Sequence, residues 1–551
     1  MVMTAMSTER DHPLAPDREW WRGAVIYQIY PRSFQDSNGD GVGDLAGIIS
    51  RLPYVASLGV DAIWVSPFFR SPMLDFGYDV QNYRDVDPLF GTIGDFDALV
   101  NRAHDLGLRV MIDLVLSHTS DQHRWFKESR SSRDNPKADF YVWADAKPDG
   151  TPPNNWLSIF GGPAWEWDTE RQQYYLHNFL KEQPDLNFHN PEVQEELLAV
   201  ARFWLERGVD GFRLDTINFY FHDKALRDNP VLPPERRSFE TAPAVNPYNW
   251  QEHLYDKSRP EMLPFLQRFR AVMDEYPAIA AVGEVGDAQR GLEIVAEYTS
   301  GGDKMQMCYA FELLAPDRPS GRRIGEVLTR FEEVAREGWA CWALSNHDCE
   351  RHASRWRLGE AEIRLFLALL LSLRGSVCLY QGEELGLPEA YVPFEDLRDP
   401  YGIRFWPKFR GRDGCRTPLP WAHDVPHAGF SEVKPWLPVS IDHLSRAVSL
   451  QEADGDSTLA FYRRMLAWRK ERRALRRGGF ELVAATETLV AFLRTDGDET
   501  ILCAFNLGDA QASMKLPPGA WRRIEGTGFE AEIDGAEASL PPHSALHAER
   551  A

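Results

Sequence analysis

The feature that most restricts the fold is a pattern that occurs eight times along the chain. Each occurrence is a short apolar run that ends in polar, acidic or glycine residues and is followed by a stretch with helical spacing. Eight strand–helix units predict an α/β fold, a closed (β/α)8 TIM barrel whose functional residues lie at the carboxyl ends of the strands. The expected strands are residues 24–30, 62–66, 110–116, 210–214, 278–285, 307–313, 340–344 and 377–380.

Two predicted helices show how such a barrel would be covered. Leu45, Ile48, Ile49 and Leu52 follow the spacing 0, +3, +4 and +7, which places one apolar stripe along a helix that packs on a sheet. Residues 361–373 are apolar almost all round and lie between the seventh and eighth expected strands, as a buried crossover helix would.

Three segments are too long to be ordinary connections between a strand and a helix. Residues 119–187, rich in Trp, Asn and Pro, predict a small inserted domain after the third strand, so that residues 1–118 and 188–476 form the barrel. Residues 218–255 and 387–443 are Pro-rich excursions after the fourth and eighth strands. All three would emerge on the face that carries the strand ends, where we expect them to wall a pocket.

The last part of the chain follows a different pattern. A final helix carries Phe461, Met465 and Trp468, and beyond about residue 477 short β-like runs alternate with turn residues. Residues 477–551 therefore predict a C-terminal antiparallel β-sandwich.

Charge and composition exclude several classes of function. The 61 basic and 83 acidic residues give a net charge of −22, which repels phosphate backbones and anionic membranes. The longest apolar run, residues 365–373, is well short of the ~20 residues that span a bilayer. The N-terminal segment lacks the apolar core of a secretory signal, and the six cysteines show no CxxC spacing. We therefore expect a cytoplasmic protein without nucleic-acid or membrane partners, with its oligomeric state open.

The expected strand ends collect carboxylates, histidines and one arginine. These are Asp113 and His118 after the third strand, Arg213 and Asp215 after the fourth, Glu284 after the fifth, and His347 and Asp348 after the seventh. An acidic residue at a strand end can simply cap the next helix, and an ion-pair network without catalysis is a second alternative. Six carboxylate or histidine positions on one rim nevertheless favour a catalytic site.

Two of these carboxylates suit the cleavage of a glycosidic bond, which needs an ionised carboxylate against the anomeric carbon and a protonated acid. Arg213 lies two residues before Asp215 on the same extended strand, so both side chains point to one side and the arginine favours the ionised aspartate. Glu284 follows the apolar run AIAAVG, and burial raises a carboxyl pKa because the ionised form loses hydration. We expect Asp215 as the nucleophile and Glu284 as the acid, with their carboxyl groups ~5–5.5 Å apart.

Four ordered motifs carry a resemblance to a known family. They are DLVLSH (113–118), GFRLDT (211–216), GEV (283–285) and SNHD (345–348). In this order they resemble the signatures of the α-amylase family of retaining glycoside hydrolases, family thirteen, and within it the α-glucosidase and oligo-1,6-glucosidase branch. The resemblance covers nearly the whole chain, and four motifs in order are far more specific than any one of them.

The resemblance implies a role for each matching residue. Asp215 would form the covalent glucosyl intermediate, Glu284 would be the acid/base, and Asp348 would be a third carboxylate that binds sugar hydroxyls. His118 and His347 would bond the same glucose, Arg213 would orient Asp215, Phe179 would line the pocket, and Tyr78, Asp79 and Arg416 would close its far end around the non-reducing glucose. Arg412 is a near neighbour of Arg416 and an alternative for that position.

Two positions depart from the wider family. Ser117 stands where many α-amylases have a calcium-binding asparagine, so we expect no calcium there. Thr216 follows the nucleophile, where branch members that prefer α-1,6 bonds tend to have valine. The resemblance therefore suggests α-1,4-linked substrates and small sugars such as maltose or sucrose.

A second site is predicted in the segment DSNGDGVGD, residues 36–44. Positions 1, 3, 5, 7 and 9 of a calcium loop are taken by Asp36, Asn38, Asp40, the Val42 carbonyl and Asp44, with Gly41 at position 6. Position 12 is Gly47 rather than the glutamate of an EF-hand, so we expect no calcium sensor. We expect one structural divalent cation, Ca²⁺ or Mg²⁺, as the branch that the chain resembles holds in this loop, and no organic cofactor. A metal-free Asx-rich turn is the alternative.

The leading interpretation is a retaining, exo-acting α-glucosidase that releases glucose from the non-reducing end of small α-glucosides and can also transfer it. A sucrose-directed hydrolase, a glucosyltransferase or an isomerase with the same residues is the nearest alternative, because acceptor choice depends on loop shape and water exclusion. An endo-acting amylase fits three long loops on the working face less well. In a different class, the fold also occurs in sugar-binding or transporter-associated proteins without catalysis, but Asp215, Glu284 and Asp348 are all present here.

Overall fold

The computed structural model describes residues 14, 17–239, 241–335 and 337–550 of the chain. Its central sheet has eight parallel strands in the order β11-β10-β9-β5-β2-β1-β13-β12. A parallel bridge between Cys308 and Ala340 joins the two outer strands, so the sheet closes into the predicted barrel. The strands are β1 (Val25–Ile29), β2 (Ala62–Val65), β5 (Arg109–Leu114), β9 (Gly211–Leu214), β10 (Ala280–Val285), β11 (Met307–Ala310), β12 (Cys341–Trp342) and β13 (Ser376–Tyr380).

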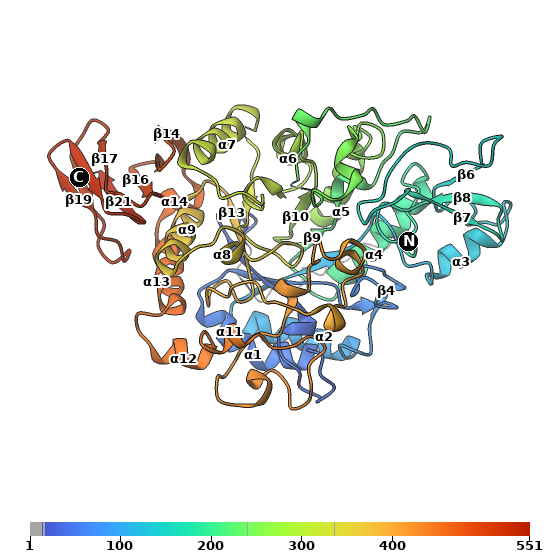
Figure 1. Cartoon of the computed structure of the whole chain (residues 1–551), viewed down its shortest axis with the longest axis horizontal. Helices are drawn as coiled ribbons and strands as arrows, with labels where there is room; N and C mark the ends of the chain where they lie inside the picture. The colour runs from blue at the N-terminus through green and yellow to red at the C-terminus, as the bar shows by residue number, and fades with distance from the viewer. Residues whose placement is uncertain (1–13, 15–16, 240, 336, 551) are drawn as a thin grey trace, which may run out of the picture.

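Helices surround this barrel (Figure 1). The principal ones are α1 (Leu45–Ser57), α2 (Ile93–Asp105), α4 (Pro191–Leu205), α5 (Met262–Asp274), α6 (Gly291–Thr299), α7 (Gly321–Val334), α9 (Glu360–Ser372) and α13 (Thr458–Glu471). Helix α1 begins after the cap Asp44, whose side chain accepts the Gly47 amide, and it buries Leu45, Ile48 and Leu52. Ile49 is only half-buried, so the apolar stripe is narrower than predicted. Helix α9 is buried over most of its length, as its composition predicts.

Strand side chains alternate between the inside of the barrel and the surrounding helices. Ile26 and Met111 belong to the inner apolar cluster. Their neighbours Tyr27 and Ile112 belong to the cluster between the sheet and the helices. Because side chains fill the inside, the barrel is a packed core, and groups that act on a substrate are restricted to the ends of the strands.

At β10, β11 and β12 the expected apolar run extends two or three residues beyond the strand. Strand β10 begins at Ala280 rather than 278, because Ala278 has a left-handed φ of 55° that an extended strand does not contain. Strand β11 ends at Ala310, where the chain turns into a 3-10 helix over Phe311–Leu313. Strand β12 pairs over Cys341–Trp342 alone. The apolar run of β10 thus begins in the turn before the strand, whereas the runs of β11 and β12 continue into the segments after them.

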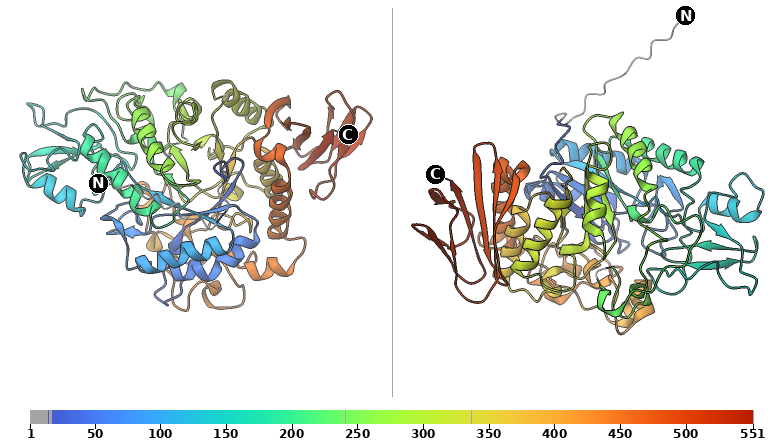
Figure 2. Two further views of the ribbon diagram at one scale, coloured as in Figure 1. Left: turned by 180° about the vertical axis from the view of Figure 1, so that it is seen from behind. Right: turned by 90° about the horizontal axis from the view of Figure 1, so that it is seen from above.

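Two smaller units lie outside the barrel. Residues 119–187 contain α3 (Arg124–Ser131) and an antiparallel sheet of β6 (Trp143–Ala144), β8 (Gln173–Leu176) and β7 (Trp165–Asp168). Residues 477–550 contain two antiparallel sheets, which are the predicted β-sandwich. One is made of β14 (Gly479–Ala485), β15 (Leu489–Asp496), β16 (Glu499–Asn506), β21 (Ser544–Arg550) and β18 (Trp521–Arg523), the other of β17 (Ala512–Lys515), β20 (Glu537–Leu540) and β19 (Glu532–Asp534). Figure 2 shows these two units at opposite ends of the molecule.

The remaining elements are short. They are the hairpin β3 (Phe69–Arg70) and β4 (Asn82–Val86), and the helices α8 (His352–Arg355), α10 (Pro400–Phe405), α11 (Ile441–Leu444), α12 (Val448–Ala453) and α14 (Arg473–Arg477). Within the described part of the chain, no helix has the length and apolar character needed to cross a membrane.

Candidate active site

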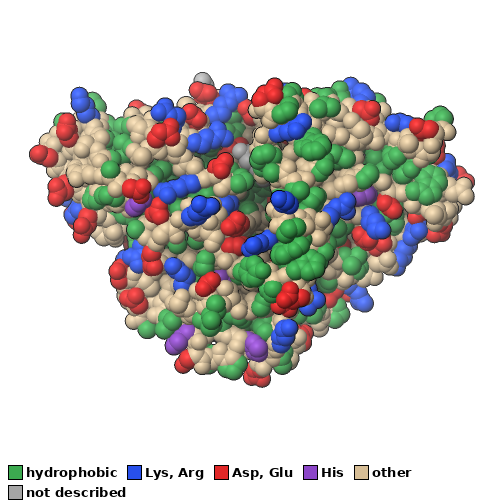
Figure 3. Space-filling model, in the orientation of Figure 1, with side chains coloured by type: hydrophobic (Ala, Val, Ile, Leu, Met, Phe, Trp, Pro, Cys, Tyr) green, Lys and Arg blue, Asp and Glu red, His purple; other side chains and the backbone are tan. Residues whose placement is uncertain are grey.

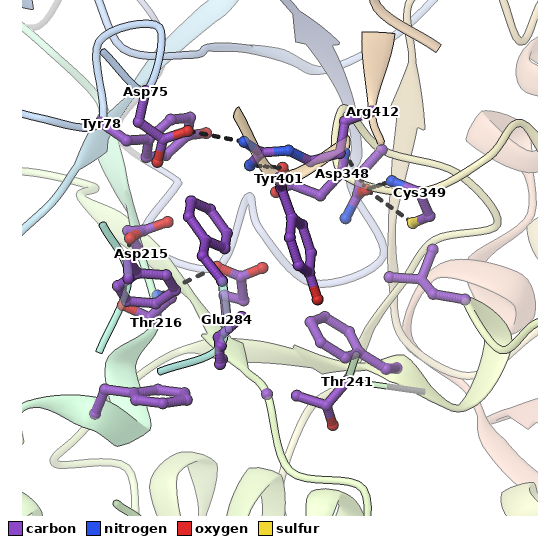
Figure 4. Close-up of a pocket in the computed structure, with 18 of the residues that line it drawn as sticks. Asp75, Tyr78, Asp215, Thr216, Thr241, Glu284, Asp348, Cys349, Tyr401 and Arg412 are labelled. Atoms are coloured by element: carbon purple, nitrogen blue, oxygen red, sulfur yellow. Dashed lines mark hydrogen bonds and ion pairs between the residues drawn. The ribbon is translucent and has the colours of Figure 1, made fainter. Parts of the chain in front are cut away.

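A cavity of about 160 Å³ opens at the carboxyl ends of the barrel strands. Asp215, Glu284 and Asp348 line it together, directly after β9, within β10 and after β12. Figure 3 looks onto this hollowed face, and Figure 4 shows the lining residues. All three long segments supply wall residues, namely Phe160 and Phe179 from the first, Thr241 from the second, and Tyr401 and Arg412 from the third.

Arg213 holds the catalytic candidates in place. Its fully buried side chain ends in a guanidinium whose Nη1 donates to Asp215 Oδ1 at 2.5 Å and to Asp113 Oδ1 at 2.8 Å. The other terminal nitrogen, Nη2, donates to Glu284 Oε2. Residues 213 and 215 do point to the same side, as the alternation of a strand predicts. A single buried cation therefore bridges the two carboxyl groups that are far apart in the sequence.

Thr216 has an unusual backbone conformation beside these two groups. Its φ of 41° and ψ of 46° lie in the left-handed region, which a β-branched residue rarely adopts. This conformation leaves its backbone N–H 3.2 Å from Glu284 Oε2 and its hydroxyl 3.2 Å from Asp215 Oδ2. Strain of this kind persists where the surrounding structure over-determines it, as at functional sites.

Both carboxyl groups have raised pKa values, and the glutamate has the higher one. Burial raises the pKa of Asp215 to about 7, against the opposing charge of Arg213. Burial likewise raises the pKa of Glu284 to about 8, and the negative charges of Asp215 and Asp348 add to the rise. Arg213 does favour the ionised aspartate, as the sequence predicts, but the loss of hydration on burial has the larger effect on the pKa of Asp215. Asp215 still ionises before Glu284, which is the order that a nucleophile and an acid require.

We expect kcat/KM for an aryl α-glucoside to follow a narrow bell-shaped pH profile. Activity rises as Asp215 ionises through about 7 and falls as Glu284 loses its proton through about 8. Because Asp215 and Glu284 interact, the two apparent pKa values of this profile describe the pair and not the individual residues. With α-glucosyl fluoride, whose leaving group needs no proton, the Glu284→Gln variant should lose the alkaline limb. An alkaline limb that survives in this variant would contradict the assignment.

Asp348 is the permanently ionised member of the site. Arg412 Nη1 and Arg416 Nη2 donate to its Oδ1 at 3.1 Å and 2.7 Å, and His347 Nε2 lies 3.1 Å from its Oδ2. Burial opposes ionisation, but the charges of Arg412 and Arg416 hold the pKa of the Asp348 carboxyl well below its usual range. A charged carboxylate in the wall can accept strong hydrogen bonds from sugar hydroxyls.

The predicted substrate-binding residues divide into two groups. Tyr78, His118, Phe179 and Thr216 line the cavity, whereas Asp79, Arg213, His347 and Arg416 do not. His347 lies behind Tyr78: the two rings are stacked with centroids 5.3 Å apart, and Nε2 is 2.5 Å from the tyrosine hydroxyl. Burial lowers the pKa of both histidines, that of His118 to about 4, so both are neutral at pH 7. In this arrangement His347 orients Tyr78 and Asp348 from behind the wall.

The pair that closes one end of the cavity is Asp75 with Arg412, not Asp79 with Arg416. Arg412 Nη2 donates to Asp75 Oδ1 at 2.8 Å, and both residues line the cavity. The Asp79 carboxylate instead accepts the Ser71 hydroxyl at 2.9 Å and the amides of residues 74 and 75 at 2.9 and 3.0 Å. Arg416 is fully buried and donates from Nε to the His347 carbonyl at 2.6 Å. Asp79 and Arg416 therefore support the wall from behind.

The sequence motif alone does not show that Asp75, rather than Asp79, pairs with the arginine at the closed end of the cavity. Asp75 and Asp79 both flank the dipeptide Gly77-Tyr78, and the chain reverses between them through left-handed φ values of 53° at Phe76 and 109° at Gly77. Such turns decide which carboxylate faces the cavity. The aromatic wall residues Phe160 and Tyr401 lay in segments that we expected to border the pocket, but no motif singled them out.

The loop of residues 36–44 has the donors of a cation site. Asp36 Oδ1 accepts the amides of residues 38 and 39 at 3.0 and 2.8 Å, and its Oδ2 accepts the Gly41 amide at 2.9 Å and the Ser431 hydroxyl at 2.6 Å. Asn38 and Asp40 cap the amides two residues on. Among the described residues, no Lys, Arg or His forms an ion pair with Asp36, Asp40 or Asp44. The described chain contains no cluster of three His, Cys, Asp or Glu side chains suited to a metal, so any cation here would also need Asn38 and the Val42 carbonyl.

The fold and the site together define a class of protein. A closed barrel with a nucleophile, a buried acid and a third carboxylate in one pocket is the arrangement of a retaining glycoside hydrolase. The chain belongs to the α-amylase family, since the model of the α-amylase catalytic domain matches residues 28–478.

Individual relatives support the same family. The chain is 67% identical over 539 residues to a probable α-glucosidase of Rhizobium meliloti (strain 1021), which covers 97% of this chain and 98% of that protein. It is 37% identical to an oligo-1,6-glucosidase of Heyndrickxia coagulans, over 92% of this chain and 96% of that one. These matches confirm the resemblance to the α-glucosidase and oligo-1,6-glucosidase branch.

Solved structures extend the comparison to glucosyl transfer. The α-glucosyl transfer enzyme XgtA has a TM-score of 0.93 and 55% identity, covering 97% of this chain and 99% of that chain. A mutant of the trehalulose synthase MutB in complex with the substrate sucrose has a TM-score of 0.86 and 33% identity, covering 96% and 99%. The fold is thus similar to that of proteins named as an α-glucosyl transfer enzyme and a trehalulose synthase.

Proposed function

We propose that this protein is a retaining, exo-acting α-glucosidase that releases glucose from the non-reducing end of small α-glucosides. The observation that carries the proposal is that Asp215 and Glu284, held by one arginine, share a cavity that the Asp75–Arg412 ion pair closes at one end. Figure 4 shows the carboxylates between that ion pair and the opposite wall.

The first step is the formation of a glucosyl-enzyme. Glu284 Oε2 accepts two hydrogen bonds, from Arg213 and the Thr216 amide, so Oε1 is the oxygen that carries the proton to the leaving group. Asp215 Oδ1 is held by Arg213 at 2.5 Å, whereas Oδ2 accepts the longer bond of 3.2 Å from the Thr216 hydroxyl, so we assign the attack on the anomeric carbon to Oδ2. The bond from that carbon to the leaving oxygen breaks as the bond to Asp215 forms.

The second step releases the sugar. Glu284, now ionised, takes a proton from water or from a sugar hydroxyl, and that oxygen attacks the anomeric carbon. The bond to Asp215 breaks and the aspartate leaves as a carboxylate. Two inversions retain the anomeric configuration.

The closed end explains the exo-action in this proposal. Asp75 and Arg412 are 4% and 7% exposed, so little open space lies beyond them for a further sugar unit. Together with the ionised Asp348 they offer charged hydrogen-bond partners to the hydroxyls of one glucose. One glucose is therefore released in each cycle.

A second candidate function of the same site is the transfer of glucose to an acceptor, or action on sucrose. XgtA is named as an α-glucosyl transfer enzyme, and the MutB mutant is in complex with sucrose as its substrate. Thr216, which lines the cavity, stands where branch members that prefer α-1,6 bonds tend to have valine, and this supports α-1,4-linked substrates such as maltose. We also propose that the protein is cytoplasmic. Its partners in this proposal are small α-glucosides.

A product profile tests linkage and transfer together. With maltose, isomaltose, trehalose and sucrose as separate substrates, we expect glucose release to be fastest from maltose or sucrose, with oligosaccharide transfer products at high concentration. Long-chain products from starch, without glucose from maltose, would reject exo-action. A sugar-binding protein without catalysis would bind these sugars and release no glucose.

We also propose that the loop of residues 36–44 holds one structural Ca²⁺ or Mg²⁺. Asp36, Asn38, Asp40, the Val42 carbonyl and Asp44 would be its ligands. The support is a run of three carboxylates without an ion-pair partner in the described chain, one of which caps helix α1. The cation would neutralise these charges and fix the connection between β1 and α1.

Removal of the cation should lower thermal stability. We expect a chelator to lower the melting temperature by roughly 2–5 °C, since a ligand that binds only the folded state stabilises it. The Asp40→Ala variant should start from the lower temperature and no longer respond to the chelator. Asp498→Ala, a change at a 97% exposed aspartate of the C-terminal domain, serves as the control and should respond like the unmodified protein. A melting temperature that the chelator does not change would contradict the proposal.

A further inference from the structure

A buried glutamine lies behind the wall that carries Asp348. Gln28, on strand β1, is 1% exposed, and its side chain points into the barrel, on the same side of the strand as Ile26. Its amide nitrogen Nε2 lies 2.7 Å from Nδ1 of His347 and 3.1 Å from the hydroxyl oxygen of Ser66. Gln28 does not line the cavity, so it can act on a bound sugar only through the side chains that it contacts.

This glutamine interrupts an otherwise apolar and aromatic strand. The sequence of β1 is VIYQI, and all five residues are buried. Burial of an amide costs free energy unless the hydrogen bonds that it makes to water are replaced. The two hydrogens on Gln28 Nε2 find replacements in Ser66 and His347.

Aromatic neighbours fix the plane of the His347 ring. Tyr78 and Tyr30 stack on it, with centroids 5.3 and 5.7 Å away and interplanar angles of 2° and 21°. The Trp64 ring meets it edge-on, with the centroids 6.0 Å apart. Stacking does not distinguish the two nitrogens of the imidazole, so the hydrogen-bond partners decide which nitrogen carries the hydrogen.

Nε2 of His347 faces two hydrogen-bond acceptors. The Tyr78 hydroxyl donates its one hydrogen to Asp113 Oδ2 at 3.0 Å, so it meets His347 Nε2, 2.5 Å away, with a lone pair. Burial raises the pKa of Asp113 to about 6, which still leaves this carboxyl ionised at pH 7 and able only to accept. The ionised Asp348 presents its Oδ2 at 3.1 Å from the same nitrogen. Nε2 must therefore carry the ring hydrogen.

Nδ1 of His347 consequently needs a donor. Burial lowers the pKa of His347 well below its ordinary value, so the ring is neutral at pH 7 and has a hydrogen on one nitrogen only. With that hydrogen on Nε2, Nδ1 is an acceptor, and Gln28 Nε2 supplies the matching hydrogen at 2.7 Å. The other hydrogen of this amide goes to Ser66 Oγ, which keeps the nitrogen, rather than the carbonyl oxygen, of Gln28 toward the ring.

We propose that Gln28 is a positioning residue of the reaction, because its amide holds His347 as the Nε2–H tautomer. This tautomer in turn holds the Asp348 carboxylate and the Tyr78 hydroxyl in place for the glucose. The inference rests on the proposed function. Figure 4 shows Tyr78 and Asp348 at the closed end of the cavity. A ring with its hydrogen on Nδ1 would turn a lone pair toward both groups and repel them, and the donor on Gln28 excludes this tautomer.

Neutron diffraction from crystals of the perdeuterated enzyme tests the tautomer directly. We expect deuterium on Nε2 of His347, none on Nδ1, and one deuterium of the Gln28 amide between its nitrogen and Nδ1. Deuterium on Nδ1, or the carbonyl oxygen of Gln28 facing it, would overturn the inference. This measurement does not depend on activity, whereas absence of glucose release from maltose would refute the proposed function.

The Gln28→Leu variant tests the effect on the reaction. The change removes the donor and keeps a buried side chain, and we expect kcat/KM for maltose to fall roughly 10-fold or more. In a His347→Ala background the same change should lower kcat/KM by no more than about twofold, because Gln28 acts through that ring. Equal losses in the two backgrounds would show that Gln28 acts independently of His347 and would overturn the inference.

Gln306→Leu is the matched control for the loss of a buried barrel amide. Gln306 is 4% exposed and lies just before β11, at the end of the barrel away from the cavity. Its Oε1 accepts the Ala281 amide at 3.0 Å, and its Nε2 donates to the Ile279 carbonyl at 3.1 Å. We expect a lower melting temperature and an unchanged kcat/KM for maltose at a temperature at which the variant is folded. If Gln306→Leu lowers kcat/KM as much as Gln28→Leu does, the loss reflects a general defect of the barrel and the inference fails.

Discussion

Replacement of Asp215 by alanine is expected to lower the turnover of an aryl α-glucoside on the order of 10⁴-fold or more. Its Oδ2 is the oxygen placed to form the covalent intermediate, and the variant removes this bond altogether. Arg213 keeps Asp113 and Glu284 as partners, so its buried charge stays compensated and the fold should survive. The measurement is steady-state turnover, with circular dichroism to verify folding.

Azide distinguishes loss of the nucleophile from a general defect. In the Asp215→Ala variant azide can enter the vacated space and attack the anomeric carbon once, so we expect β-glucosyl azide as the product. In the Glu284→Ala variant the covalent intermediate still forms, and azide should give α-glucosyl azide. Near-normal turnover in Asp215→Ala, or the α product from that variant, would defeat the assignment.

The second large effect is expected for the pair at the closed end of the cavity. Asp75→Asn should lower kcat/KM for maltose by roughly 10- to 150-fold, the range that corresponds to one hydrogen bond to a charged group. The substitution keeps the size of the side chain but removes the charge that pairs with Arg412. Because maltose and phenyl α-glucoside present the same non-reducing glucose, both substrates should be affected equally.

Asp79→Asn is the matched control in the same turn. The Asp79 carboxylate holds the Ser71 hydroxyl and two backbone amides, so the change should mainly lower the melting temperature. If Asp79→Asn lowers kcat/KM for maltose more than Asp75→Asn does, then the closing pair has been assigned to the wrong aspartate. The comparison is made at a temperature at which both variants are folded.

Strand periodicity explains why the barrel and the convergence of its strand-end carboxylates could be predicted. The eight apolar runs each overlap one barrel strand, and Asp215, Glu284 and Asp348 follow or end three of them. In a parallel barrel all strand ends of one kind meet on one face, so residues that follow different strands converge without any further information. Side chains two residues apart on a strand point to the same side, so the common direction of Arg213 and Asp215 could also be predicted.

The barrel, the inserted domain, the β-sandwich and the meeting of three carboxylates on one face could be predicted, because strand alternation and strand order are local and periodic properties. The sequence did not show that Asp75 and Arg412, rather than Asp79 and Arg416, face the cavity. These residues lie in turns and long connections. There the direction of a side chain depends on left-handed backbone angles and on partners that are hundreds of residues away in the chain, so no repeating pattern in the sequence records it.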